Sequence, residues 1–148
     1  TVLVNGPTSG ANGAMDIGDG GGATFKITGG LLVAAGSSGM AIAPGTTSTQ
    51  YSVLVNFTSQ AANSLFHLQD SAGTEMVTFA PVKTFQSVAF SSPDLAKGTY
   101  KVYLGGSHTG TKTDSLCGEG DYSPGTLNTT FTISSVTTKV GSGGGPGW

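Results

Sequence analysis

The chain has 148 residues, a formal net charge of −2 and 9% charged residues, which is the size of a single domain. All 6 basic residues are lysines scattered along the sequence, so the chain has no basic face for binding the phosphates of a nucleic acid. No apolar stretch approaches the roughly 18 residues of a membrane-spanning helix. We therefore expect neither a nucleic-acid partner nor insertion into a membrane.

The N-terminal third of the chain contains a rough internal repeat. Short apolar runs, ended by glycine or other small residues, occur at 2–4, 14–17, 23–28, 31–36 and 40–43. The first two runs return after nearly 30 residues as the last two. Short strands that end in glycine and recur at such an interval are typical of a coil of a parallel β-solenoid. The sequence therefore predicts solenoid coils over residues 1–49.

Residues 50–140 carry longer runs in which apolar and polar residues alternate, as in 51–58. Alternation with turn signals between the runs is typical of antiparallel strands with one buried face. We expect these strands to cap the solenoid as a meander or sandwich-like layer. A long polar loop is predicted at 105–126 and the last strand at 131–136. The whole of 1–140 is thus predicted to be one all-β domain.

The sequence begins and ends with features of its own. It starts directly in a strand-like run, Thr1–Val4, without a signal peptide or initiator methionine, and we interpret it as a mature or processed product. It ends in a glycine-rich tail, 141–148, for which Trp148 is the expected apolar anchor. The single cysteine, Cys117, cannot form an internal disulfide, and we expect it to be a small, partly buried residue.

Four stretches together resemble a known family. They are 27–41 (ITGGLLVAAGSSGMA), 78–81 (TFAP), 91–95 (SSPDL) and 131–136 (FTISSV). The chain resembles the C-terminal portion of the pectate-lyase-like, carbohydrate-binding β-helix proteins that polysaccharide-degrading bacteria secrete. The resemblance covers about residues 1–140, and family members carry further coils ahead of this point. It implies a right-handed parallel β-helix with a C-terminal cap, export to the cell surface, calcium bound in the coils, and affinity for cellulose-type or acidic polysaccharides without cleavage.

The titratable residues do not form a combination typical of an enzyme. A polysaccharide lyase uses a basic residue beside bound calcium, whereas this chain has no arginine and dispersed lysines. A glycosidase needs two carboxylates about 5–10 Å apart, and acidic pairs such as Glu119 and Asp121 lack polar catalytic partners. A nucleophilic triad would need His67 or His108 as its base, but one lies in mid-strand and the other in a glycine-rich loop. We predict that the chain is not an enzyme.

Two acidic groups are candidate calcium ligands. Asp16 and Asp19, at a glycine-rich corner, offer carboxylates and turn carbonyls, the oxygen ligands that Ca²⁺ prefers. Asp114, Glu119 and Asp121 form the second group, in the predicted loop. An aspartate beside a glycine is also ordinary turn chemistry, and neither group completes a calcium site without backbone carbonyls or a neighbouring subunit. Calcium is nevertheless the cofactor that we expect, if any.

Aromatic side chains outside the predicted core are the candidates for stacking on sugar rings. They are Tyr100, Tyr103, Tyr122 and Trp148. The odd separation of Tyr100 and Tyr103 puts them on opposite faces of a strand, so we expect at least one to be exposed; a half-buried strand position is the alternative for any of them. Asn56 and Asn128 begin N-glycosylation sequons.

Two functions fit this pattern. The first is a secreted, non-catalytic polysaccharide-binding domain at the cell surface, for which an exposed aromatic strip or a calcium site would be the distinguishing feature. The alternative is a structural subunit of an extracellular filament or matrix fibre, a homopolymer joined head-to-tail through the open N-terminal strand and the C-terminal tail.

Overall fold

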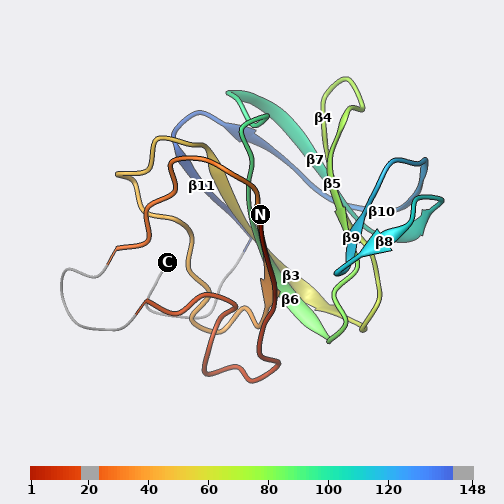
Figure 1. The fold of residues 1–148 in the computed structure, drawn as a ribbon, viewed down its shortest axis with the longest axis horizontal. Coiled ribbons are helices and arrows are strands. Elements are labelled where there is room, and N and C mark those ends of the chain that lie inside the picture. The colour runs from red at the N-terminus through yellow and green to blue at the C-terminus, as the bar shows by residue number, and fades with distance from the viewer. Residues whose placement is uncertain (18–23, 142–148) are drawn as a thin grey trace.

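Two β-sheets form the framework of the computed structural model, which describes residues 1–17 and 24–141 (Figure 1). The strands are β1 (Val2–Asn5), β2 (Leu32–Gly36), β3 (Ser52–Gln60), β4 (Phe66–Asp70), β5 (Glu75–Phe79), β6 (Phe85–Ser91), β7 (Gly98–His108), β8 (Lys112–Thr113), β9 (Leu116–Cys117), β10 (Tyr122–Ile133) and β11 (Thr137–Val140). The described residues contain no helix, and so none that could span a membrane. The all-β class expected from the sequence is therefore confirmed.

The first sheet, which we call sheet A, has the order β1-β2-β6-β3-β11. Its centre is antiparallel, with β6 between β2 and β3. Each edge is a parallel pair, β1 with β2 and β11 with β3. Val2 pairs with Leu32, so the first parallel ladder joins residues 30 positions apart, which is the interval of the repeat in the sequence.

The second sheet, sheet B, has the order β10-β7-β4-β5-β9-β8 and is antiparallel throughout. Residues 105–126, predicted as a polar loop, instead contribute the end of β7, the β8–β9 hairpin and the start of β10. The strand predicted at 131–136 is therefore part of β10, which begins at Tyr122, where it pairs with His108, and ends at Ile133; β11 follows it. This ladder was missed because most of β10 is exposed on both faces, and its sequence therefore lacks the apolar alternation that marks a half-buried strand.

The main core lies between the two sheets. Alternate residues of sheet A, such as Val53 and Val55, pack against alternate residues of sheet B, such as Phe66, Leu68 and Val102. All five are less than 1% exposed, and burying each such side chain contributes roughly 1.5–3 kcal/mol. Because neighbouring residues of a strand point to opposite faces, the residues between these core positions in sheet B face outward.

The other face of sheet A is covered by the N-terminal residues, which form a third layer (Figure 1). Ile27 and Ala41 in this layer pack on Leu32, Leu54 and Ala89 of the sheet. The predicted strands at 14–17 and 40–43, and the described part of 23–28, are extended segments and not strands, because they are tied to the rest of the chain by isolated hydrogen bonds and apolar contacts. A solenoid with parallel coils is not shown; the fold is two open sheets with this added layer.

Candidate functional site

The outward face of sheet B brings polar and aromatic side chains into one row. His67 of β4 lies opposite Thr78 of β5 on one side and Tyr103 of β7 on the other. Each of the three falls between inward-facing core positions of its own strand, so all three point outward. Strand alternation predicted the outward direction of His67, whereas for Tyr103 it predicted only that Tyr100 and Tyr103 lie on opposite faces.

Tyr122, at the start of β10, lies flat on His67. The ring centroids are 3.8 Å apart and the planes differ by 3°. The tyrosine hydroxyl donates to the carbonyl of Gly105 at 2.7 Å and accepts from the amide of Gly125 at 3.1 Å. Tyr103 approaches both rings at a tilt of 59°. The Tyr122 ring is therefore held by its stack on His67 and by the two hydrogen bonds of its hydroxyl.

A hydrogen-bonded network fixes the imidazole of His67 beneath this stack. Thr78 Oγ1 donates to Glu75 Oε2 at 2.7 Å. The same Thr78 Oγ1 lies 2.7 Å from His67 Nδ1. The other ring nitrogen, Nε2, lies 3.0 Å from Gln69 Oε1. Burial lowers the pKa of His67 below its ordinary value of 6.5, outweighing the Gln69 hydrogen bond and the Glu75 carboxylate, which both raise it.

His108, at the end of β7, faces the same carboxylate. Its Nδ1 accepts from the amide of Gly110 at 2.9 Å, which leaves the proton of the neutral ring on Nε2. That Nε2 lies 3.3 Å from Glu75 Oε2, in a side chain that is 1% exposed, and it has no hydrogen-bond partner. Glu75 Oε2 also lies 3.4 Å from His67 Nδ1, so this carboxylate is close to two buried imidazoles. The Glu75 side chain is itself 33% exposed.

A groove of about 270 Å³ lies beside the stack. Its lining side chains are His67, Gln69, Glu75, Asp121, Tyr122 and Pro124. The Asp121 backbone is anchored to Thr109, whose hydroxyl accepts from the Asp121 amide at 2.8 Å and whose amide donates to the Asp121 carbonyl at 3.1 Å. The groove therefore combines a rigid aromatic ring, a side-chain amide and two carboxylates. It offers binding groups, with no serine, cysteine or lysine nucleophile in its lining.

The structure separates the four aromatic candidates. Tyr103 and Tyr122 come together in the site, whereas Tyr100 is 4% exposed and packs in the main core with its hydroxyl bonded to the Ala96 backbone. The Tyr100 ring has no surface to offer a ligand. Trp148 lies outside the described residues. Opposite placement of Tyr100 and Tyr103, inferred from their odd separation, is confirmed.

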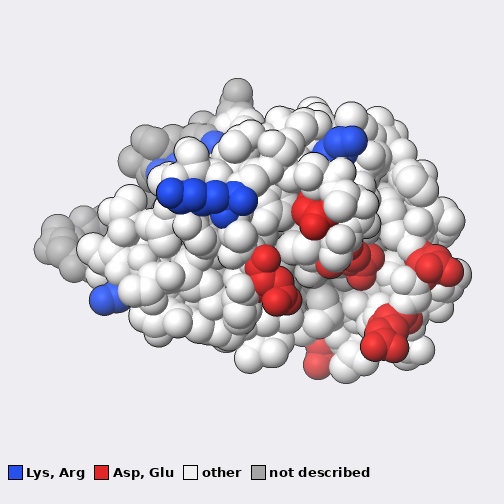
Figure 2. Space-filling view, turned by 90° about the horizontal axis from the view of Figure 1, so that it is seen from above, with Lys and Arg blue, Asp and Glu red and all other residues white. Residues whose placement is uncertain are grey.

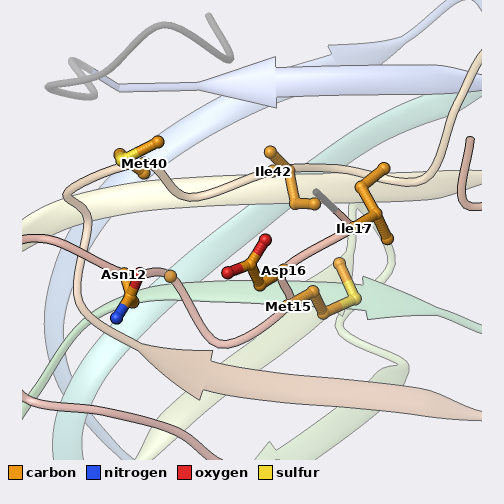
Figure 3. A pocket seen from close by; sticks show the side chains of 7 residues that line it. Asn12, Met15, Asp16, Ile17, Met40 and Ile42 are labelled. Atoms are coloured by element: carbon orange, nitrogen blue, oxygen red, sulfur yellow. The ribbon is translucent and has the colours of Figure 1, made fainter. Parts of the chain in front are cut away.

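The acidic candidates do not gather into one site. Asp16 lines a pocket of about 60 Å³ beside Met15, Met40 and Ile42, and Figure 3 shows its carboxylate among these apolar side chains. Its predicted partner, Asp19, lies outside the described residues. Within residues 1–17 and 24–141, His, Cys, Asp and Glu form no group of three or more arranged to hold a metal ion.

The second acidic group is divided between two places in sheet B. Asp114 occupies the turn of the β8–β9 hairpin, where it has a φ of 50° and lines a different pocket from Asp121. Glu119 is exposed in the segment that leads to β10. Of the four predicted metal ligands that belong to the described residues, only Asp121 therefore lines the groove. The sequon at Asn56 is 4% exposed, whereas Asn128 is exposed on β10.

Four residues of this site were not predicted to be binding residues. His67 and His108 were considered only as catalytic bases, and Gln69 and Glu75 were not considered. Strand alternation identifies His67 as an outward residue, but no sequence pattern indicates that His108 and Tyr122 reach it from β7 and β10. Comparison with known proteins finds no matching family model, curated protein or solved structure.

Proposed function

We propose that this chain is a non-catalytic polysaccharide-binding domain, secreted to the cell surface, and that the groove beside Tyr122 is its binding surface. The observation that carries this proposal is the Tyr122 ring, half-buried and locked over His67 at the edge of a groove lined with polar groups. A flat, immobile aromatic ring with hydrogen-bonding groups around it suits a sugar ring, which presents apolar C–H faces and a hydroxyl rim. Little side-chain freedom is lost when the ligand binds.

The size of the groove fits part of a long chain rather than an enclosed ligand. Its 270 Å³ is just below the roughly 300–1,000 Å³ of pockets that surround a small molecule. Gln69, Glu75 and Asp121 supply acceptors, and Gln69 also supplies a donor, for the hydroxyls of a few sugar units.

The resemblance to secreted β-helix proteins supports the same function. In that interpretation the parallel pairing of β1 with β2, across 30 residues, belongs to the last coil of a right-handed solenoid, and β3–β11 form its cap. Calcium remains part of the proposal as a possible bridge between Asp121 or Glu75 and an acidic glycan.

A depletion assay on insoluble cellulose and pectate, with calcium or a chelator, tests the proposal. Tyr122→Ala removes the ring and should weaken binding roughly tenfold or more, as truncation of an aromatic anchor does. Tyr122→Phe is the matched control, because it keeps the ring and loses only the hydroxyl, and it should retain most of the affinity. Thermal melts of both variants establish that they are folded. Equal binding by Tyr122→Ala and the parent would contradict the groove as the binding surface.

The free edge of β1 favours a second candidate function, the self-assembling subunit. In the described residues β1 pairs only with β2, and Val2 on this strand is 55% exposed. Unpaired backbone groups on such an edge can accept a strand from another molecule. The tail proposed to supply that strand begins at Gly141 and otherwise lies outside the described residues.

A single proline separates the two candidates. The amides of Val2 and Gly6 donate to the carbonyls of Leu31 and Ala35, on the side of β1 that faces β2. Because amides alternate between the two sides of a strand, the amide of Leu3 points to the open edge. Leu3→Pro removes that donor, whereas Leu3→Ala truncates the same side chain and keeps the donor. If the chain polymerises through this edge, light scattering and negative-stain imaging will show polymers for Leu3→Ala and shorter species for Leu3→Pro. Monomers of the unmodified chain at every concentration would exclude this candidate.

A further inference from the structure

The charge of the groove selects among polysaccharides. Glu75 and Asp121 line it, and its lining contains no lysine. His67, the lining residue that could carry a positive charge, has a pKa below its ordinary value because it is buried. Figure 2 shows carboxylates gathered on one part of the face that it draws, with one lysine near them and the other lysines farther away. The acidic side chains of the lining are therefore not balanced by a lysine in the lining.

The carboxylate of Glu75 is positioned before any ligand arrives. Thr78 holds Oε2 at 2.7 Å, and the unpartnered Nε2 of His108, in a side chain that is 1% exposed, faces the same oxygen at 3.3 Å. A third of the Glu75 side chain stays exposed. Its negative charge is thus fixed in orientation and still accessible.

The aromatic ring and the carboxylates together suit a cation. The face of a tyrosine ring attracts an ammonium group, and a carboxylate accepts charge-assisted hydrogen bonds from it. Tyr122 and the two carboxylates line the same groove: Asp121 precedes Tyr122 in the chain, and Glu75 lies 3.4 Å from His67, on which Tyr122 stacks. We propose that the groove binds a polysaccharide of amino sugars with free amines, such as β-1,4-linked glucosamine, in preference to a polyuronate. This inference rests on the proposed polysaccharide-binding function and specifies its ligand.

Isothermal titration with matched hexasaccharides tests the inference at mildly acidic pH, where the sugar amine is charged. The probes are glucosamine, N-acetylglucosamine, glucose and galacturonate hexamers, the last with and without calcium, and short polylysine. We expect the glucosamine hexamer to bind on the order of tenfold more tightly than the neutral hexamers, with an advantage that falls as salt rises. The galacturonate hexamer should bind most weakly.

Three variants locate the effect. Glu75→Gln and Asp121→Asn remove one charge each and nearly preserve shape, so each should weaken binding of the glucosamine hexamer severalfold more than binding of the glucose hexamer. Asp94→Asn is the matched control, because Asp94 is exposed and does not line the groove, and it should change nothing.

The outcomes separate this inference from the function on which it rests. If a neutral hexamer or galacturonate binds as tightly as the glucosamine hexamer, the charge preference is wrong and polysaccharide binding stands. Equal affinity for polylysine would overturn the inference, since charge alone would then explain binding. If no hexamer binds, the proposed function fails together with its ligand.

Discussion

The ring of Tyr122 lies 3.8 Å above the imidazole of His67, with the two planes 3° from parallel. The two residues are on strands separated by β7 in sheet B, and the stack therefore ties β10 to β4 across an intervening strand. The hydroxyl bond from Tyr122 to Gly105 adds β7 to the same unit. The outward face of sheet B thus has one stiff region, which is where the groove lies.

Folding stability should decrease as the pH falls below about 6.5, the ordinary pKa of histidine. Burial lowers the pKa of folded His67, so between its folded pKa and 6.5 the unfolded chain binds a proton that the folded chain does not. The stabilisation is complete above pH 6.5 and is lost progressively below it. The groups that face His67 are Thr78, Gln69, Glu75, His108, Tyr103 and Tyr122. Urea unfolding across this pH range measures the slope.

The variant His67→Phe provides the control for this pH dependence. It keeps an aromatic ring beneath Tyr122 and removes the titrating group. Its stability should fall less steeply than that of the parent between pH 6.5 and mildly acidic values. The same slope in both proteins would assign the effect to other groups.

Substituting two adjacent glycines, one at a time, separates the cost of an unfavourable backbone conformation from the cost of a steric clash. Gly105 and Gly106 both have positive φ, 78° and 82°, which costs an alanine roughly 1–2 kcal/mol. A Cβ on Gly105 would meet nothing within 4 Å, whereas one on Gly106 would meet the Ser123 carbonyl and, at 2.9 Å, the Tyr122 hydroxyl. Gly105→Ala should therefore cost about 1–2 kcal/mol and leave binding intact. Gly106→Ala should cost roughly 2–4 kcal/mol and weaken binding as well. Denaturant unfolding and the depletion assay measure the two effects, and equal effects of both variants would rule out crowding.

Cys117 should resist alkylation in the folded protein. It is 7% exposed, and burial is the main cause that raises the pKa of its thiol above 9.0. Because the thiolate is the reactive form, iodoacetamide at neutral pH should label the native chain far more slowly than the urea-unfolded chain. A Thr113→Cys, Cys117→Ser double variant carries an exposed cysteine on the same hairpin and should react rapidly when folded. Fast labelling of native Cys117 would show that the hairpin opens readily.

The core between the sheets should respond strongly to truncation. Phe90 of β6 is 0% exposed within it, and Phe90→Ala should reduce the free energy of unfolding by roughly 3–5 kcal/mol. Val82→Ala, at a residue that is 57% exposed, should change it by less than about 0.5 kcal/mol. Urea denaturation of the three proteins would contradict the structure if the two substitutions had similar effects.

Strand alternation predicted the central part of the fold well. Val53, Val55, Phe66 and Leu68 lie in the core, and His67 lies on the opposite face, because a half-buried strand imposes a period of two on its sequence. The alternation did not reveal which strands pair, since pairing depends on residues distant in the chain. The pairing of the first half of β10 with β7 and the pairing of β11 with β3 were therefore not predicted.

The site was harder to predict than the fold for the same reason. Tyr122 was identified as a candidate, but its position over His67 depends on two glycines with positive φ and on a hydroxyl bond to the backbone. Glu75 belongs to the site because β5 pairs with β4. Local sequence patterns predict the face of the strand to which a side chain points. They do not predict its neighbours, because these depend on which strands pair in the folded sheet.

The central position of β6 in sheet A has a consequence for synthesis. Residues of β2, at 32–36, find their antiparallel partner only in residues 87–91, and β3 gains its outer neighbour only from residues 137–140. A ribosome releases the N-terminal layer long before the sheet that it covers can form. Nascent chains will therefore expose the apolar surface of Leu32 and Leu54 to solvent for much of translation, and contacts of such long sequence separation favour slow folding.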